Sequence, residues 1–275
     1  MAYYARVAKL MLPHLADRPV AMLRAPSGIA GQKFFQKHAD EGALPGVTRL
    51  PAELDPDHRP LLVIDDTAAL LTVAQMNVVE LHTWNATHHA LEQPDRLIFD
   101  LDPGEGVEWA EVVEGTILMR TLLDELGLKS FVKTSGGKGL HIVLPLKPKL
   151  GWDEAKEFSG DLVRHMSRVL PQRFVAKSGE RNRVGRIFID FLRNGRGATT
   201  VAAWSARSRP GMGISVPITW EELPGLTERP AWNVTDTADR LSIGNAPWRG
   251  YERARQSLDA AMKKFTAISR GAPRR

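Results

Sequence analysis

Arg96-Leu97-Ile98-Phe99-Asp100-Leu101-Asp102-Pro103-Gly104 is the stretch that decides the fold. Its branched and aromatic residues predict a buried strand, and the Pro-Gly pair ends that strand. Residues two apart in a strand point to the same face, so Asp100 and Asp102 project together at its carboxyl end. Two adjacent carboxylates repel each other unless a cation lies between them, and oxygen ligands suit Mg²⁺ or Mn²⁺. In the alternative, one aspartate caps the next helix and the other is solvated.

After this strand, the sequence predicts a series of α-helices and β-strands. The pattern predicts a long amphipathic helix over 107–126, strands over 131–134 and 140–144, a helix over 153–170 and a strand over 186–191. Strand, helix, strand, strand, helix, strand is the split βαβ, ferredoxin-like order that RNA-recognition modules share. We therefore predict an α+β fold, which by itself does not specify a function.

The segments on either side are less regular. A helix is expected from Tyr3, with Pro13 as its stop or kink, and short strands are expected over 18–24 and 61–64. Asp65 and Asp66 would begin the following helix rather than chelate a metal, because adjacent strand residues face opposite ways.

Asp190 is a third acidic residue in an apolar strand, Ile187-Phe188-Ile189-Asp190-Phe191-Leu192. A carboxylate there needs a partner, because burying an unpaired charge is costly. If its strand lies beside that of Asp100, three carboxylates converge, as in a two-metal site for phosphoryl transfer. The alternative is a structural ion pair with Arg193 or Arg186.

A glycine-rich turn, Ser135-Gly136-Gly137-Lys138-Gly139, separates the two central strands. Glycines let the backbone approach a phosphate closely, and Ser135, Lys138 and His141 would add donors and charge. The spacing is not that of a P-loop, and a plain glycine hairpin remains open. Arg193, Arg207 and Arg209 follow and could neutralise a polyphosphate, or could form a solvated basic face.

Aromatic residues beside basic ones could form a platform for bases. Phe34 and Phe35 precede Lys37, and Trp84 follows His82 by two residues. Aromatic side chains stack single-stranded bases, but core packing is the alternative for each of them. His82 taken alone is more often a structural histidine than a functional one.

Composition limits the possible classes. The 275 residues are 43% hydrophobic, enough for a core, and carry a formal charge of +5, which mildly favours a polyanionic partner. The absence of cysteine excludes disulfides, thiol nucleophiles and cysteine-based metal sites. No apolar run approaches the ~18 residues of a membrane span. We expect a cytoplasmic, nucleoid-associated protein without a membrane partner.

Together these stretches resemble the polymerase domain of bacterial ligase D, a member of the archaeo-eukaryotic primase superfamily that serves non-homologous end joining. The resemblance covers about residues 3–245. It rests on Phe34-Phe35-Gln36-Lys37-His38, Val79-Glu80-Leu81-His82-Thr83-Trp84, Asp100-Leu101-Asp102-Pro103-Gly104, Lys133-Thr134-Ser135-Gly136-Gly137-Lys138-Gly139-Leu140-His141 and Phe188-Ile189-Asp190-Phe191-Leu192-Arg193-Asn194.

The resemblance implies a two-lobed primase-like fold and template-directed addition of NTPs or dNTPs to a primer 3′ end. Asp100, Asp102 and Asp190 would be catalytic and would bind two Mn²⁺ or Mg²⁺ ions. The incoming nucleotide would contact His82, Ser135, Lys138, His141, Arg193, Arg207 and Arg209. The nucleic acid would contact Phe34, Phe35, Lys37 and Trp84.

We divide the single domain over 1–268 into an N-terminal lobe (1–95), a catalytic core (96–205) and a C-terminal closing segment (206–268), followed by a basic tail (269–275). The family usually has tens of residues before the Tyr3-Tyr4 helix that help to bind a downstream 5′-phosphate, and this chain starts after them. It also lacks a Lys-x-Asp-Gly adenylation motif, so no ligase activity of its own is expected.

The expected partners are DNA ends or primed and gapped DNA, with an end-binding protein and a separate ligase as further candidates. Two other classes remain open. One is a non-catalytic nucleic-acid-binding module, which would need exposed aromatic residues on its sheet. The other is a metal-dependent nuclease that uses the same three aspartates.

Overall fold

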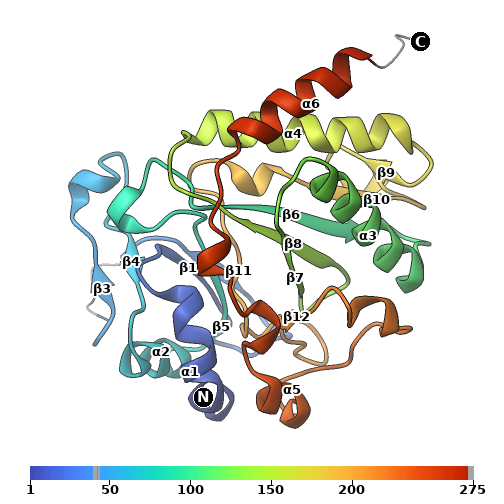
Figure 1. Ribbon diagram of the computed structural model, residues 1–275. Helices are drawn as coiled ribbons and strands as arrows, with labels where there is room; N and C mark the ends of the chain where they lie inside the picture. The colour runs from blue at the N-terminus through green and yellow to red at the C-terminus, as the bar shows by residue number, and fades with distance from the viewer. Residues whose placement is uncertain (40–41, 43, 272–275) are drawn as a thin grey trace.

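The computed structural model describes residues 1–39, 42 and 44–271, and its strands form two main sheets (Figure 1). The larger sheet has the strand order β12-β7-β8-β6-β10-β9. Its strands are β6 (Arg96–Pro103), β7 (Phe131–Thr134), β8 (Leu140–Pro145), β9 (Phe174–Val175), β10 (Ile187–Asp190) and β12 (Pro217–Ile218).

The centre of this sheet confirms the predicted α+β order. β6 is paired in antiparallel fashion with β8 on one side and with β10 on the other, and β7 extends the sheet beyond β8. The two connecting helices are α3 (Trp109–Glu125) and α4 (Trp152–Val169). β9 and β12 are added at the two edges.

Successive side chains of β6 point to opposite faces of the larger sheet. Leu97, Phe99 and Leu101 are fully buried and pack in one hydrophobic cluster with residues of α3, α4 and α6 (Asp259–Gly271). Figure 1 shows α4 and α6 running side by side along this side of the molecule. Asp100 and Asp102 alternate with these residues and therefore face away from the helices.

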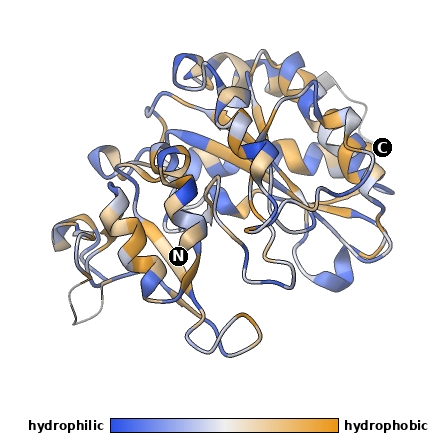
Figure 2. Cartoon of the chain, turned by 90° about the horizontal axis from the view of Figure 1, so that it is seen from below, coloured by the Kyte–Doolittle hydropathy of each residue, from blue (hydrophilic) through white to orange (hydrophobic). Residues whose placement is uncertain are grey.

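A second sheet with the order β11-β5-β1-β2 forms the N-terminal region. Its strands are β1 (Val20–Arg24), β2 (Phe34–Gln36), β5 (Val78–Thr83) and β11 (Thr200–Val201). The helices α1 (Ala2–Leu15) and α2 (Thr67–Gln75) bury their apolar faces in its core, and so do residues between 202 and 216. In Figure 2 hydrophobic residues follow the strands inside the molecule, and hydrophilic ones lie on outward faces of the helices.

The remaining elements are short. β3 (Thr48–Arg49) and β4 (Leu62–Val63) form a two-stranded ribbon, and α5 (Ala238–Ile243) lies in the C-terminal part. Asp66 caps α2, with its side chain accepting a hydrogen bond from the Ala69 amide at 2.7 Å, as predicted. No helix in the described residues is long and apolar enough to cross a lipid bilayer.

The ends of several elements differ from the prediction. Pro13 does not stop α1, which continues to Leu15, because the helix keeps Met11 and Leu15 fully buried and loses only one backbone hydrogen bond at the proline. The strand expected over 186–191 spans only Ile187–Asp190. Residues 269–271 of the expected basic tail continue α6, and 272–275 lie outside the described residues.

Candidate active site

Three aspartates meet on one face of the larger sheet. Asp100 on β6 is the direct antiparallel partner of Asp190 on β10, and Asp102 lies two residues further along β6, opposite Phe188. Directly paired Cα atoms of antiparallel strands lie about 4.5–5.5 Å apart, and residues two apart share a face. The expectation that these strands are neighbours is therefore confirmed, and it brings together carboxylates that are 90 positions apart in the chain.

Each carboxylate has a basic neighbour. His141 Nε2 lies 3.3 Å from Asp100 Oδ1, and Arg193 Nε lies 3.0 Å from Asp190 Oδ2. Arg183 forms an ion pair with Asp102. The ion pair between Asp190 and Arg193, which was the alternative interpretation, is thus present. The ligand oxygens of the three aspartates do not all lie within 4.8 Å of one another in this arrangement.

The electrostatics of the three carboxyl groups differ. Burial raises the pKa of Asp102, and the charge of Asp100 raises it further. Burial and Asp100 also raise the pKa of Asp190, although Arg193 offsets part of this. Burial would raise the pKa of Asp100 as well, but the nearby His141 and arginines outweigh it and lower that pKa to about 2. Negative charge is therefore crowded here, and a bound cation would relieve the repulsion.

The glycine-rich turn lies beside these strands. The Ser135 hydroxyl accepts hydrogen bonds from the Gly137 and Gly139 amides at 3.2 Å, so Ser135 holds the turn in shape. A Cβ atom on Gly139 would lie 2.0 Å from the Leu101 carbonyl oxygen, so only glycine fits against β6. Lys138 is exposed at the tip of the turn.

The buried side chain of Glu80, in the second sheet, holds two of the predicted site residues, His82 and Arg207, by hydrogen bonds. Glu80 on β5 is 4% exposed, and its Oε2 accepts hydrogen bonds from His82 Nε2 at 2.8 Å and Arg207 Nε at 3.0 Å. Its Oε1 accepts from the Ser208 amide at 2.7 Å. Burial opposes the charge of Glu80, but these donors outweigh it and lower the pKa of Glu80 to about 2. The charged carboxylate therefore fixes His82 and Arg207 in place.

Two clefts meet at these residues and share Arg209. The larger has a volume of about 880 Å³ and reaches Asp102, and the smaller has a volume of about 380 Å³ and reaches Asp100. The larger is lined by five basic residues and three acidic ones: Lys138, Arg181, Arg183, Arg209 and Arg229, with Asp102, Glu105 and Glu180. The smaller gathers the predicted residues Phe35, His82, His141, Arg193, Arg207 and Arg209. Clefts with this balance of charge suit a polyanionic ligand.

The predicted base-stacking residues separate into two groups. Phe34 and Phe35 on β2 are 43% and 53% exposed, and the Phe35 ring lies 5.2 Å from that of His82. Lys37 is exposed just beyond them. Trp84 is only 4% exposed and packs edge-on against Trp152. The Trp84 ring, just after β5, lies in a hydrophobic cluster, which agrees with the core-packing alternative for this residue.

Sequence reasoning missed three residues at this site. Glu80 could have been found, because it lies two residues before His82 in a strand and shares its face. Arg183 gave no local signal, because only the folded chain brings its segment to Asp102. Lys133 is fully buried and donates a hydrogen bond to Ser215 Oγ at 2.7 Å, and burial holds its pKa well below the usual value.

An acidic triad on a ferredoxin-like sheet beside a basic cleft is the arrangement that the resemblance to primase-like polymerases implies. Consistent with this, residues 1–248 match the family model described as "LigD, primase-polymerase domain". The chain thus belongs to the LigD primase-polymerase domain family and is a nucleotidyltransferase of the polymerase type.

Individual relatives agree with this assignment. The chain is 49% identical over 264 residues to the multifunctional non-homologous end joining protein LigD of Pseudomonas aeruginosa. This match covers 95% of this chain and 31% of that protein. It is 32% identical over 229 residues to the corresponding LigD of Mycobacterium tuberculosis, covering 80% of this chain and 30% of that protein. The chain therefore spans about a third of the length of these relatives.

A solved structure supports the same fold. The polymerase domain of Mycobacterium tuberculosis ligase D in complex with DNA superposes with a TM-score of 0.81 and 28% sequence identity. The match covers 92% of this chain and 90% of that one. The predicted two-lobed, primase-like α+β fold is confirmed at this level.

Proposed function

We propose that this chain adds nucleotides to the 3′ end of a primer on a DNA template during end-joining repair. The observation that carries the proposal is the pairing of Asp100 with Asp190 across β6 and β10, with Asp102 on the same face and two basic clefts alongside. The LigD relatives named for non-homologous end joining, and the related polymerase domain solved with DNA, support it.

The three aspartates would hold two Mn²⁺ or Mg²⁺ ions once Arg183 and Arg193 release Asp102 and Asp190. Carboxylate oxygens are the hard ligands that these ions prefer, and substrate phosphates can complete the octahedron. Asp100, Asp102 and Asp190 would hold one ion, and Asp100 with Asp102 would hold the other. When bound, such ions lower the pKa of the primer 3′-hydroxyl and stabilise charge on the triphosphate. Asp100 is ionised at neutral pH, and His141 holds its oxygen from the side.

The other residues of the clefts would bind and orient the nucleotide. Arg193, Arg207 and Arg209 would neutralise its phosphates through charged hydrogen bonds, with Lys138 at the edge of the larger cleft. His82, held by Glu80, would lie beside the sugar. Ser135 would act by shaping the turn that faces the phosphates.

The DNA would lie along the exposed face that Phe34, Phe35 and Lys37 occupy. Exposed aromatic rings stack bases, and a neighbouring lysine attracts the backbone. In this proposal 1–95 forms the lobe that carries these residues, 96–205 forms the catalytic core, and 206–268 closes the site. A DNA-end-binding protein and a ligase activity would supply the other steps of repair.

Asp190→Asn tests the proposal. Manganese-dependent extension of a primed template should fall by at least about 1,000-fold, because the variant removes one charge from the shared metal shell. DNA binding should change by less than about threefold, because it depends on basic side chains. Extension at the normal rate in this variant would disprove the assignment. Degradation of labelled DNA without nucleotide addition would favour a nuclease.

A further inference from the structure

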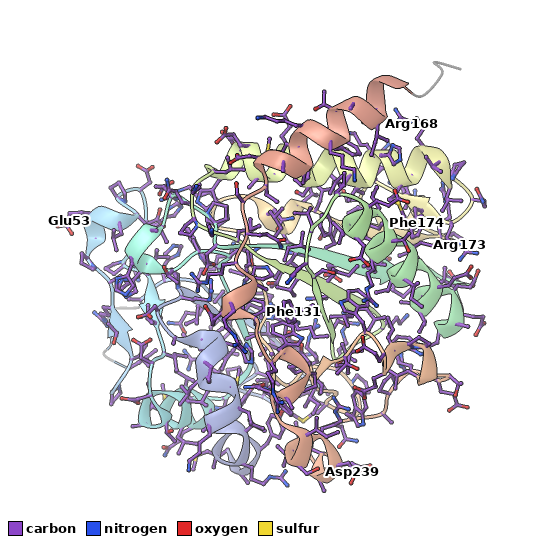
Figure 3. All side chains as sticks on the ribbon, in the orientation of Figure 1. Glu53, Phe131, Arg168, Arg173, Phe174 and Asp239 are labelled. Atoms are coloured by element: carbon purple, nitrogen blue, oxygen red, sulfur yellow. The ribbon has the colours of Figure 1, made fainter. Side chains whose placement is uncertain are left out.

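A cluster of side chains that could hold a metal ion lies at the outer corner of the N-terminal lobe, next to the 3-10 helix Ala52–Leu54, whose Glu53 is labelled in Figure 3. It consists of His38, Asp55 and His58. Asp55 and His58 are the first and last residues of a turn closed by a hydrogen bond from the His58 amide to the Asp55 carbonyl at 3.0 Å. His38 arrives from β2 and forms an isolated β-bridge with Leu61.

Two of the three spacings between ligand atoms are close to those around a tetrahedral metal ion, and all three atoms lie within 4.8 Å of one another. Asp55 Oδ2 lies 3.4 Å from His38 Nε2 and 3.2 Å from His58 Nδ1. Ligands at 2.0–2.1 Å from a tetrahedral Zn²⁺ ion are separated from each other by about 3.3 Å. The two imidazole rings are stacked, with an interplanar angle of 4° and centroids 4.9 Å apart, so the exposed His58 ring would turn to bring both nitrogens onto one ion.

The carboxylate is buried and held in place from behind. Asp55 is 4% exposed, and Arg196 Nη1 donates to its other oxygen, Oδ1, at 3.0 Å. Arg196 also forms an ion pair with Glu92 and lies over the Trp84 ring. Carboxylates that bind metals are usually fixed by such a hydrogen bond on the oxygen that faces away from the ion. Arg196 therefore supplies the orientation and leaves Oδ2 to the two histidines.

Imidazole nitrogens and one carboxylate oxygen select the metal. This donor set suits Zn²⁺ among the common divalent ions, whereas Mg²⁺ and Ca²⁺ prefer oxygen alone. The His58 side chain is 55% exposed, so the fourth position would be open to water.

We propose that His38 Nε2, Asp55 Oδ2 and His58 Nδ1 bind one Zn²⁺ ion at a site separate from the three catalytic aspartates. The ion fastens the segment that follows β2 to the turn at 55–58. Because β2 carries Phe34 and Phe35, the site braces the strand that presents these exposed rings.

Asp17, His88 and His89 form a similar cluster and provide the control. Their side chains are more open, with Asp17 51% and His89 66% exposed. Asp17 Oδ1 lies 3.3 Å from His89 Nε2 and 3.6 Å from His88 Nε2. An exposed carboxylate gains less from a metal ion than a buried one, so this cluster should not bind zinc tightly.

The test is Zn²⁺ titration of the full chain against a chromophoric chelator, with millimolar Mg²⁺ present to occupy the aspartate site. Wild type should bind one Zn²⁺ ion, and His58→Asn should weaken that binding at least tenfold. His89→Asn should bind Zn²⁺ as wild type does. Co²⁺ in place of Zn²⁺ should give the visible absorption of a tetrahedral site in wild type but not in His58→Asn.

A thermal measurement gives a second readout of the same site. One equivalent of Zn²⁺ should raise the unfolding temperature of wild type and His89→Asn, but not that of His58→Asn. Because His58 is exposed, its variant should fold normally without metal, and an unchanged unfolding temperature without zinc checks this. Unaltered zinc affinity in His58→Asn, a loss in His89→Asn, or no binding by wild type at micromolar zinc would each overturn the proposal.

Discussion

Replacing Glu80 with glutamine tests how the nucleotide side of the site is held. The amide keeps the shape of the side chain but removes the charge that accepts hydrogen bonds from His82, Arg207 and the Ser208 amide. The guanidinium of Arg207 then lacks a charged partner, and the imidazole of His82 loses its fixed orientation. We expect Glu80→Gln to destabilise the fold and to weaken nucleotide binding together.

The size of the effect follows from the pKa of Glu80. Burial would raise it, yet the surrounding donors lower it from the ordinary 4.5 to about 2. Each tenfold change in proton affinity is about 1.4 kcal/mol, so the fold favours the carboxylate over a neutral group by about 3 kcal/mol. Removing one partner of a buried ion pair costs a similar amount, about 3–5 kcal/mol. We therefore expect a loss of about 2–4 kcal/mol at pH 7.

The stabilisation also has a defined pH window. Because the folded-state pKa is lowered, the stabilisation is complete above the unfolded pKa of about 4.5 and is lost as the pH falls toward 2. At pH 3.5 the gap between wild type and Glu80→Gln should be smaller by about 1.4 kcal/mol than at pH 7.

Urea unfolding at both pH values measures the difference in unfolding free energy between wild type and Glu80→Gln. The KM for the nucleotide reports whether nucleotide binding is weakened. The control is Glu252→Gln, because Glu252 forms an ion pair with Arg255 at 2.7 Å but is 69% exposed. The control should lose less than about 1 kcal/mol. A Glu80→Gln protein within 0.5 kcal/mol of wild type, or a gap that does not change with pH, would refute this reasoning.

Two other perturbations follow from the packing. Gly139→Ala should destabilise the protein by about 2–4 kcal/mol and abolish extension, because its Cβ would lie 2.0 Å from the Leu101 carbonyl oxygen. Gly225→Ala is the control, because a Cβ there meets nothing within 4 Å, and its unfolding in urea should change little. Burial lowers the pKa of His14 to about 4, so the free energy of unfolding should decrease as the pH falls from 6.5 toward 4. In unfolding curves measured over this range, His14→Asn should show a smaller decrease than wild type.

Strand alternation made the acidic site predictable from the sequence. Asp100 and Asp102 lie two apart in an apolar strand, and Asp190 is a charge that its own strand cannot bury alone. From this spacing and burial we expected Asp100 and Asp102 to share one face and Asp190 to lie beside a partner. The antiparallel register of β6 and β10 places Asp190 directly opposite Asp100 on that face. The order of helices and strands followed from the same periodicity.

The burial of Trp84, the ion pair of Arg183 and the course of α1 at Pro13 have one physical origin. The burial of Trp84 and the ion pair of Arg183 with Asp102 depend on which distant segment packs nearby, and no local pattern records that. Pro13 shows the same effect on a helix, because tertiary packing of Met11 and Leu15 outweighs one lost backbone hydrogen bond. Glu80 differs from these, because its spacing from His82 placed it on the site face.

The most direct measurement is the anomalous diffraction of a crystal that contains Mn²⁺, primed DNA and a non-hydrolysable nucleoside triphosphate. The account predicts two manganese peaks, with oxygens of Asp100 and Asp102 about 2 Å from both and an oxygen of Asp190 at the same distance from one. Arg183 should then have moved away from Asp102. Peaks that avoid Asp190, with Arg193 and Arg183 still paired to their aspartates beside a bound triphosphate, would contradict it.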